Sequence, residues 1–420
     1  MPITGREIGP VRLNSELDEM AIPRTRPGSF PAILSYGFRP FFLVGSLYAG
    51  LTILFWLPLF YGHLETFSVF APVDWHVHEM LFGYLSAVVT GFLLTAIPNW
   101  TGRLPVQGLP LLALVVIWLA GRLAVFFSAE IGWVAAAVID CTFLLAVAAA
   151  AAIEIVAGRN WRNLKVLAPV TVLFAANVCF HVEANLNGLS DLSRRLAIGA
   201  ALVLIMIVGG RIIPSFTRNW LVRENPGRLP IPFNRLDSVT IVLSAAALAA
   251  WAVYPGALAT GAMLIAGSAL NVVRLVRWAG DRTLRDPLVF ILHAAYFFLP
   301  AGLMLGGLAA IFPEAVPSAA AIHAFGAGAI GSMTLAVMAR ATLGHTGRNL
   351  EANPGTSMVF ASMVSSAILR IAAAFFPGQT LLLHASATAW AIAFLGYAVL
   401  FGGMLIGPKV APRQPNRAAA

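Results

Sequence analysis

Apolar segments about as long as a bilayer is thick recur along this chain, and they constrain its fold more than any other feature. About 20 helical residues cross the roughly 30 Å hydrocarbon core of a membrane. Only 11% of the residues are charged, against about 25% in soluble proteins. A transmembrane β-barrel would show short alternating segments instead. The sequence therefore predicts an all-α polytopic membrane protein with about 12 transmembrane helices, at 38–61, 76–98, 107–127, 132–156, 164–185, 195–214, 238–255, 258–276, 287–311, 318–340, 356–376 and 381–406.

Basic residues indicate how these spans are oriented. Of the 27 Lys and Arg residues, 23 fall in the N-terminal segment, in the loops that follow even-numbered spans, or in the C-terminal tail. The opposite loops hold only Arg194 and Arg195. The positive-inside rule then places both termini in the cytoplasm. The same distribution explains the net charge of +9 without a nucleic-acid partner.

The chain divides into a membrane domain at 37–406, with cytoplasmic tails at 1–36 and 407–420. The first tail lacks the apolar core of a cleavable signal peptide. The longest polar stretch, 215–237, is rich in Pro and Arg and is predicted to be a loop between spans 6 and 7. Cys141 and Cys179 both fall in predicted spans, where packing is a better interpretation than a disulfide.

The predicted topology places most ionisable residues of the spans toward the outer end. Such residues are costly within a membrane and usually functional, so we expect a site there. A histidine near a helix end can instead simply bond to water or lipid headgroups, which we favour for His63 and His384. For His76 the two interpretations are balanced, and for the others we favour metal ligation. The group comprises His63, His76, His78, His181, His323, His384, Glu79, Glu183, Arg122 and Arg370.

An internal similarity links spans 2 and 10. Residues 78–103 and 323–348 both begin with His and end with Thr-Gly-Arg. The end of span 6, "RIIPSFTRNW", is a weaker variant of the same pattern. Because the pattern recurs at every fourth span, the chain is predicted to contain three four-helix pseudo-repeats.

If spans 2 and 10 are equivalent, His78 and His323 lie at equal depth, and two facing imidazoles suit a haem b held between them. Small residues such as Gly83, Gly326, Gly328, Gly331 and Ser332 offer room for the ring, although they serve close helix packing equally well. Arg122 and Arg370 can neutralise the haem propionates. Hydrogen bonding between helices, or snorkelling to the interface, explains these arginines just as well.

His76 and His78 lie about 200° apart on an ideal helix. They cannot share a pocket unless residues 74–77 are not yet helical, and Asp74 is a plausible N-cap for a later helix start. His76 is therefore predicted to have a separate role, either as a hydrogen-bonding group or as a ligand of a second metal. His181 is the natural partner for a copper-type imidazole site.

Five segments together resemble the NnrS family: "GFRPFFL" (37–43), "WHVHEMLFGY" (75–84), "GFLLTAIPNWTGR" (91–103), "GRIIPSFTRNW" (210–220) and "MTLAVMARATLGHTGR" (333–348). The resemblance covers roughly residues 35–405. It implies a twelve-span protein of the bacterial inner (cell) membrane that contains haem and copper and takes part in nitric oxide metabolism, tolerance or denitrification.

The chain also resembles, more distantly, the main subunit of haem-copper oxidases. That subunit has three four-helix sets and holds its low-spin haem with histidines from spans 2 and 10. It also needs copper-ligating histidines on spans 6 and 7, and residues 195–214 and 238–255 contain none. The resemblance therefore does not imply reduction of oxygen or nitric oxide by the oxidase mechanism.

Three hypotheses follow for the function. The first is a haem and copper membrane protein that binds, senses or turns over nitric oxide or a related small ligand, with an electron-donor protein as a further partner beside membrane lipid. The second is a secondary transporter, which twelve spans and interrupted helices also fit. The third is a passive scaffold for another complex. Whether the chain is an enzyme stays open at this point.

Overall fold

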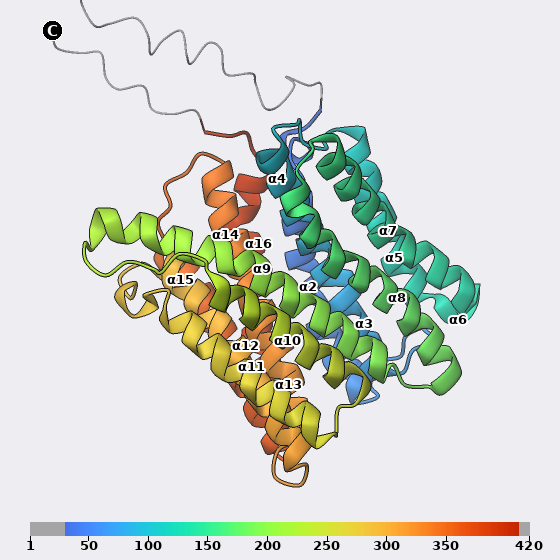
Figure 1. The fold of residues 1–420 in the computed structure, drawn as a ribbon. Coiled ribbons are helices and arrows are strands. Elements are labelled where there is room, and N and C mark those ends of the chain that lie inside the picture. Colours follow the sequence, from blue (N-terminus) through green and yellow to red (C-terminus); the bar gives the residue numbers. More distant parts are fainter. Residues whose placement is uncertain (1–29, 411–420) are drawn as a thin grey trace, which may run out of the picture.

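The computed structural model describes residues 30–410, so most of the two predicted tails lies outside the described residues. Within that part, twelve helices are long and apolar enough to cross a membrane, which confirms the predicted number (Figure 1). In chain order the spans are α2 (Phe38–Phe60); α3 (Pro72–His78), η2 (Glu79–Leu85) and α4 (Ser86–Thr101) as one continuous span; α5 (Leu109–Phe126); α7 (Trp133–Ala157); η3 (Trp161–Val166) with α8 (Leu167–Asn187); α9 (Asp191–Glu224); α10 (Arg235–Val253); α11 (Leu258–Val276); α12 (Pro287–Ile311); α13 (Ser318–His323), η5 (Ala324–Gly331) and α14 (Ser332–His345) as another; α15 (Pro354–Phe375); and α16 (Thr380–Ile406).

The sixth span is longer than predicted. Helix α9 continues through Pro214 to Glu224, so the prediction that residues 215–237 form a loop is wrong for their first ten residues. A proline inside a helix removes one backbone hydrogen bond. Tertiary contacts keep the helix going beyond it, because Leu221 is buried and the Thr217 hydroxyl is hydrogen-bonded to His293 Nε2 at 2.8 Å.

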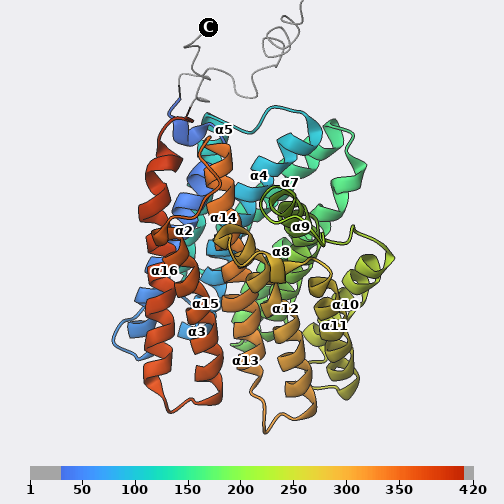
Figure 2. The same cartoon turned by 90° about the vertical axis from the view of Figure 1, so that its left-hand side faces the viewer.

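Successive spans pack beside one another, and α16 closes the bundle by packing against α2. In Figure 2, α16 lies at one flank and α10 and α11 lie at the other. The inner positions belong to spans 2, 6, 9 and 10, whose most apolar windows are 83%, 61%, 67% and 67% buried. Span 10 contacts both span 2 and span 6. The three helices predicted to be equivalent in the pseudo-repeats thus meet inside the bundle.

Spans 2 and 10 share an interruption of the same kind at the same place. The π-helical segment η2 follows His78 directly, and η5 follows His323 directly. Short π-helical segments are rare and occur frequently at functional sites. The sequence similarity between 78–103 and 323–348 therefore corresponds to a shared backbone feature.

Both ends of the described chain lie at one end of the bundle. The buried guanidinium of Arg39 donates hydrogen bonds to the carbonyl oxygens of Leu405 at 2.9 Å and Gly407 at 2.6 Å. We call this end, which carries the Arg-rich loops, the basic end. Arg228 also lies there and donates to Asp281, which holds the pKa of that carboxyl below its ordinary value. Cys141 and Cys179 are free thiols, as predicted.

Helices α11 and α12 cross closely at Gly261 and Gly307. A Cβ atom added to Gly307 would lie 2.8 Å from the Gly261 carbonyl oxygen. We expect Gly307→Ala to lower the free energy of unfolding by about 1–3 kcal/mol, because overpacking forces the helices apart. Gly403→Ala in α16 is the matched control, since its Cβ would meet nothing within 4 Å. Equal melting temperatures of the two variants in detergent would contradict this crossing.

Candidate metal centre

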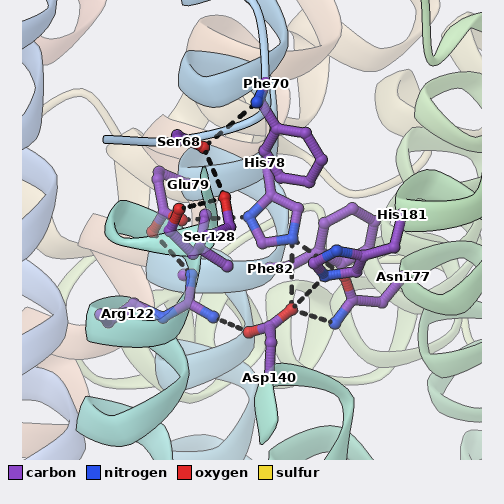
Figure 3. A network of polar contacts seen from close by, with 12 residues as sticks. Ser68, Phe70, His78, Glu79, Phe82, Arg122, Ser128, Asp140, Asn177 and His181 are labelled. Atoms are coloured by element: carbon purple, nitrogen blue, oxygen red, sulfur yellow. Dashed lines mark hydrogen bonds and ion pairs between the residues drawn. The ribbon is translucent and has the colours of Figure 1, made fainter. Parts of the chain in front are cut away.

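Three buried side chains converge toward the end of the bundle opposite the basic end. His78 is the last residue of α3, Asp140 lies in the second turn of α7, and His181 lies near the end of α8. Figure 3 shows the two imidazoles turned toward the same carboxylate. One ligand atom from each of the three lies within 4.8 Å of the others, and none of the side chains is more than 2% exposed. The three side chains therefore bring their ligand atoms close enough together to bind one metal ion.

The distances also suit a metal. Asp140 Oδ2 lies 3.2 Å from His78 Nε2 and 3.1 Å from His181 Nε2. Ligand atoms about 2.0–2.1 Å from a tetrahedral ion are roughly 3.3 Å apart. A small movement of the side chains would therefore place one ion among the three atoms. Imidazole and carboxylate ligands suit copper, zinc and iron ions.

A wider hydrogen-bonded network fixes these ligands. The His78 ring is bonded at Nδ1 to Glu79 Oε1, at 3.0 Å, and at Nε2 to Asn177 Oδ1, at 3.1 Å. The Asn177 amide also donates to Asp140 Oδ2 at 2.8 Å. Partners of this kind set the orientation and basicity of metal-ligating side chains. The ligand set is thus held in place before any ion binds.

Arg122 joins the two carboxylates of the network. Its guanidinium donates to Glu79 Oε2 at 2.6 Å and to Asp140 Oδ1, and the Tyr48 hydroxyl donates to Glu79 as well. Two carboxylates and one guanidinium leave a net charge of −1 in a dry interior, where unbalanced charge is expensive. A bound cation, or a protonated imidazole, would balance it.

Aromatic rings cover the histidines. The ring of His78 lies 5.1 Å from those of Phe70 and Phe82 and 5.2 Å from that of Phe180. Phe70 comes from the segment between α2 and α3, where the Ser128 hydroxyl accepts a hydrogen bond from the Val69 amide at 2.9 Å. An apolar shell of this kind controls solvent access to a metal. A ligand of the centre must therefore be small, or Phe70 must move.

His76 does not join this group. Residues 72–78 are helical, so the condition under which His76 and His78 could share a pocket is not met. Ala71, and not Asp74 as expected, precedes the first turn. Pro72 explains the earlier start, because its fixed φ suits the first helical position. His76 consequently faces away from His78 and stacks on Trp56, with ring centroids 4.3 Å apart. The separate role predicted for His76 agrees with this geometry, but its pairing with His181 does not.

A second group forms around Arg370 in α15. His76 and His323 both lie close enough to Arg370 to be influenced by its charge. His323 Nδ1 donates to the Ala319 carbonyl oxygen at 2.8 Å. A neutral imidazole bonded in this way presents the lone pair of Nε2 to a ligand, as metal-binding histidines commonly do.

The expected haem site at spans 2 and 10 is only partly accommodated. His323 fits an axial ligand, and a Cβ at the neighbouring Gly326 would meet nothing within 4 Å. Gly83, Gly328 and Gly331 instead serve close packing, since a Cβ at each would lie under 3.0 Å from a neighbouring atom. Nε2 of His78 lies 3.1 Å from Asn177 Oδ1 and 3.2 Å from Asp140 Oδ2, which places this histidine in the metal group. The pairing of His78 with His323 around a haem stays a prediction.

Sequence reasoning missed Asp140, Asn177 and Tyr48. Asp140 carries a signal that was available, because it is an acid within an apolar span. Asn177 and Tyr48 carry no comparable signal. Glu183, expected in the same outer group, instead caps α9 by accepting hydrogen bonds from the Leu192 and Ser193 amides at 2.9 Å each.

Comparison with protein-family models matches residues 32–409 to a family described as NnrS protein. The match covers nearly the whole chain and includes every residue of the centre described above. Comparison with the curated proteins gives no match.

Arg122 should contribute strongly to the stability of the protein. We expect Arg122→Met to lower the free energy of unfolding by about 3–5 kcal/mol, because it leaves two buried carboxylates without their cation. Adding Glu79→Gln should recover part of that loss by removing one of the charges. Thermal unfolding of both variants in detergent measures this, and strictly additive destabilisation would contradict the coupling.

Proposed function

Because the chain belongs to the NnrS family, we propose that it is a haem- and copper-containing membrane protein that binds nitric oxide or a related small ligand. The observation that carries the proposal is the buried group of His78, Asp140 and His181. Imidazole and carboxylate groups are metal ligands, and the group is buried. Together with Glu79 and Arg122 it carries a net charge of −1, which favours a bound cation. The proposed location is the bacterial inner membrane, with the basic end and both termini in the cytoplasm.

The copper ion would be held by His78, Asp140 and His181. When bound, copper supplies a redox-active, ligand-binding ion. Around it, Asn177 and Glu79 would orient the ligands, and Arg122 would keep Asp140 ionised and aimed at the ion. Phe70, Phe82 and Phe180 would exclude bulk water, so a small uncharged ligand such as nitric oxide enters more readily than an anion does.

The haem would be held from span 10 by Nε2 of His323, which its Nδ1 hydrogen bond to Ala319 leaves available. Haem iron binds nitric oxide directly. Arg370 would neutralise a propionate, and His76, which interacts electrostatically with Arg370 and His323, would be a second histidine able to hold the haem. If His78 and His323 held the haem instead, His78 would no longer be available to Asp140 and His181. Variants of single histidines separate these two arrangements.

A secondary transporter is the second candidate. The buried Glu79–Arg122–Asp140 chain favours it, since carboxylates next to a guanidinium within the membrane can carry protons. In that case, protein free of haem and copper would still move a solute across liposomes. The metal-binding proposal requires no such flux.

Asp140→Ala and His181→Ala should lose the bound non-haem metal ion, because each removes one of three ligands. Metal analysis of the purified protein after copper loading and dialysis measures this. His63→Ala and His384→Ala, which change exposed histidines, should keep the wild-type metal content. Full copper retention by Asp140→Ala would remove the proposed copper site.

His323→Ala should abolish the Soret band of the purified protein, together with its shift on adding nitric oxide, because the variant removes the proposed axial ligand. Asp140→Ala should keep both signals. If His78→Ala also loses the Soret band while Asp140→Ala and His181→Ala keep it, His78 and His323 hold the haem. If His323→Ala keeps a normal Soret band, the haem is bound elsewhere.

A further inference from the structure

The segments 91–103, 210–220 and 333–348 lie toward the basic ends of spans 2, 6 and 10. They carry much of the sequence similarity between these spans but have no part in the metal centre. They meet around a single cavity of about 890 Å³. Asn99 of α4, Arg211 and Arg218 of α9, and Arg340 and His345 of α14 all line it. Ligand-binding pockets commonly have volumes of about 300–1,000 Å³.

The cavity is strongly cationic. Its lining includes four arginines (Arg211, Arg218, Arg223 and Arg340) and no carboxylate. Within the part of the chain that the structure describes, none of the four forms an ion pair with an acidic side chain. Arg340 instead lies over the ring of Phe216, 4.1 Å from its centroid, and Arg211 donates to Asn163 at 2.9 Å. Asp286, which does not line the cavity, interacts electrostatically with Arg223 and Arg340 and balances part of their charge. The remaining positive charge of the lining favours an anion.

The inner end of the cavity is apolar. Phe92, Val208 and Val337 line the cavity and also line a narrow apolar slot that runs deeper between α4, α8, α9 and α14. The arginines lie toward the surface, where Arg211, Arg218 and Arg223 are exposed. A ligand that fits both parts carries its negative charge at one end and an apolar chain at the other.

We propose that this cavity binds an anionic phospholipid from the leaflet at the basic end, with the phosphate on the arginines and the start of an acyl chain in the slot. Basic pockets between transmembrane helices are known to select such headgroups at the cytoplasmic side. A free phosphate ion would use the same arginines and leave the slot empty, so the two sources of phosphate can be told apart. The bound lipid would join spans 2, 6 and 10 at their basic ends.

The test counts phosphatidylglycerol molecules retained by purified full-length protein in native mass spectrometry, titrated against phosphatidylcholine. Arg218→Gln with Arg223→Gln should weaken retention by about thirtyfold, because two arginines close to the phosphate are neutralised. Arg235→Gln with Arg285→Gln is the matched control. It removes two exposed charges from the same end outside the cavity and should leave retention unchanged. Equal losses in the two double variants would overturn the proposal.

Val337→Phe separates lipid from free phosphate. Filling the entrance of the slot should weaken retention of phosphatidylglycerol without changing the binding of inorganic phosphate, measured by competition. If inorganic phosphate competes fully and Val337→Phe has no effect, the cavity is a phosphate site and the lipid proposal is wrong. Because Val337→Phe alters no charge, it also decides the question if the arginine double variant fails to fold. Neither variant touches the copper or haem residues, so their metal content reports on the proposed function independently.

Discussion

The interaction on which the rest of the metal centre depends is the buried guanidinium of Arg122 between two carboxylates. Glu79 and Asp140 come from different spans, and neither has another cationic partner of fixed charge among the described residues. Without Arg122 they would repel each other in a dry interior, where such charges are expensive. With it, Glu79 holds one side of the His78 imidazole and Asp140 approaches the other. One arginine on α5 thereby aligns side chains from α3, η2, α7 and α8.

The helix interruptions explain how these side chains reach one another. In span 2, His78 closes a short α-helix and Glu79 opens a π-helical segment. Short π-helical segments of this kind occur frequently at functional sites. His323 and η5 repeat the arrangement in span 10. The two spans nonetheless use their histidines differently, since His78 faces Asp140 and His181 whereas His323 lies with His76 and Arg370. His78 and His323 thus occupy equivalent backbone positions but contact different side chains.

Much of this architecture could be predicted from the sequence, because membrane spans follow from length and hydropathy alone. The twelve spans and the presence of His78, His181 and Arg122 at one depth were accessible in this way. The pairing of His78 with His181 was not, because it depends on how each helix is rotated about its axis, which neighbouring helices decide. Asp140 carried the signal of an intramembrane acid, but nothing in its local sequence indicates that α7 turns it toward two imidazoles. The continuation of α9 past Pro214 likewise rests on tertiary contacts of Thr217 and Leu221.

The metal centre and the cationic cavity lie toward opposite ends of the bundle, yet span 2 contributes to both. Its N-terminal end supplies His78 and Glu79, and its C-terminal end supplies Phe92 and Asn99. Span 10 repeats this division, with His323 at one end and Arg340 and His345 at the other. Both helices are largely buried, so a movement at one end has to be accommodated by the packing that surrounds the other. A molecule that binds in the cavity would therefore act on the same two helices that position the histidines, without approaching any of them.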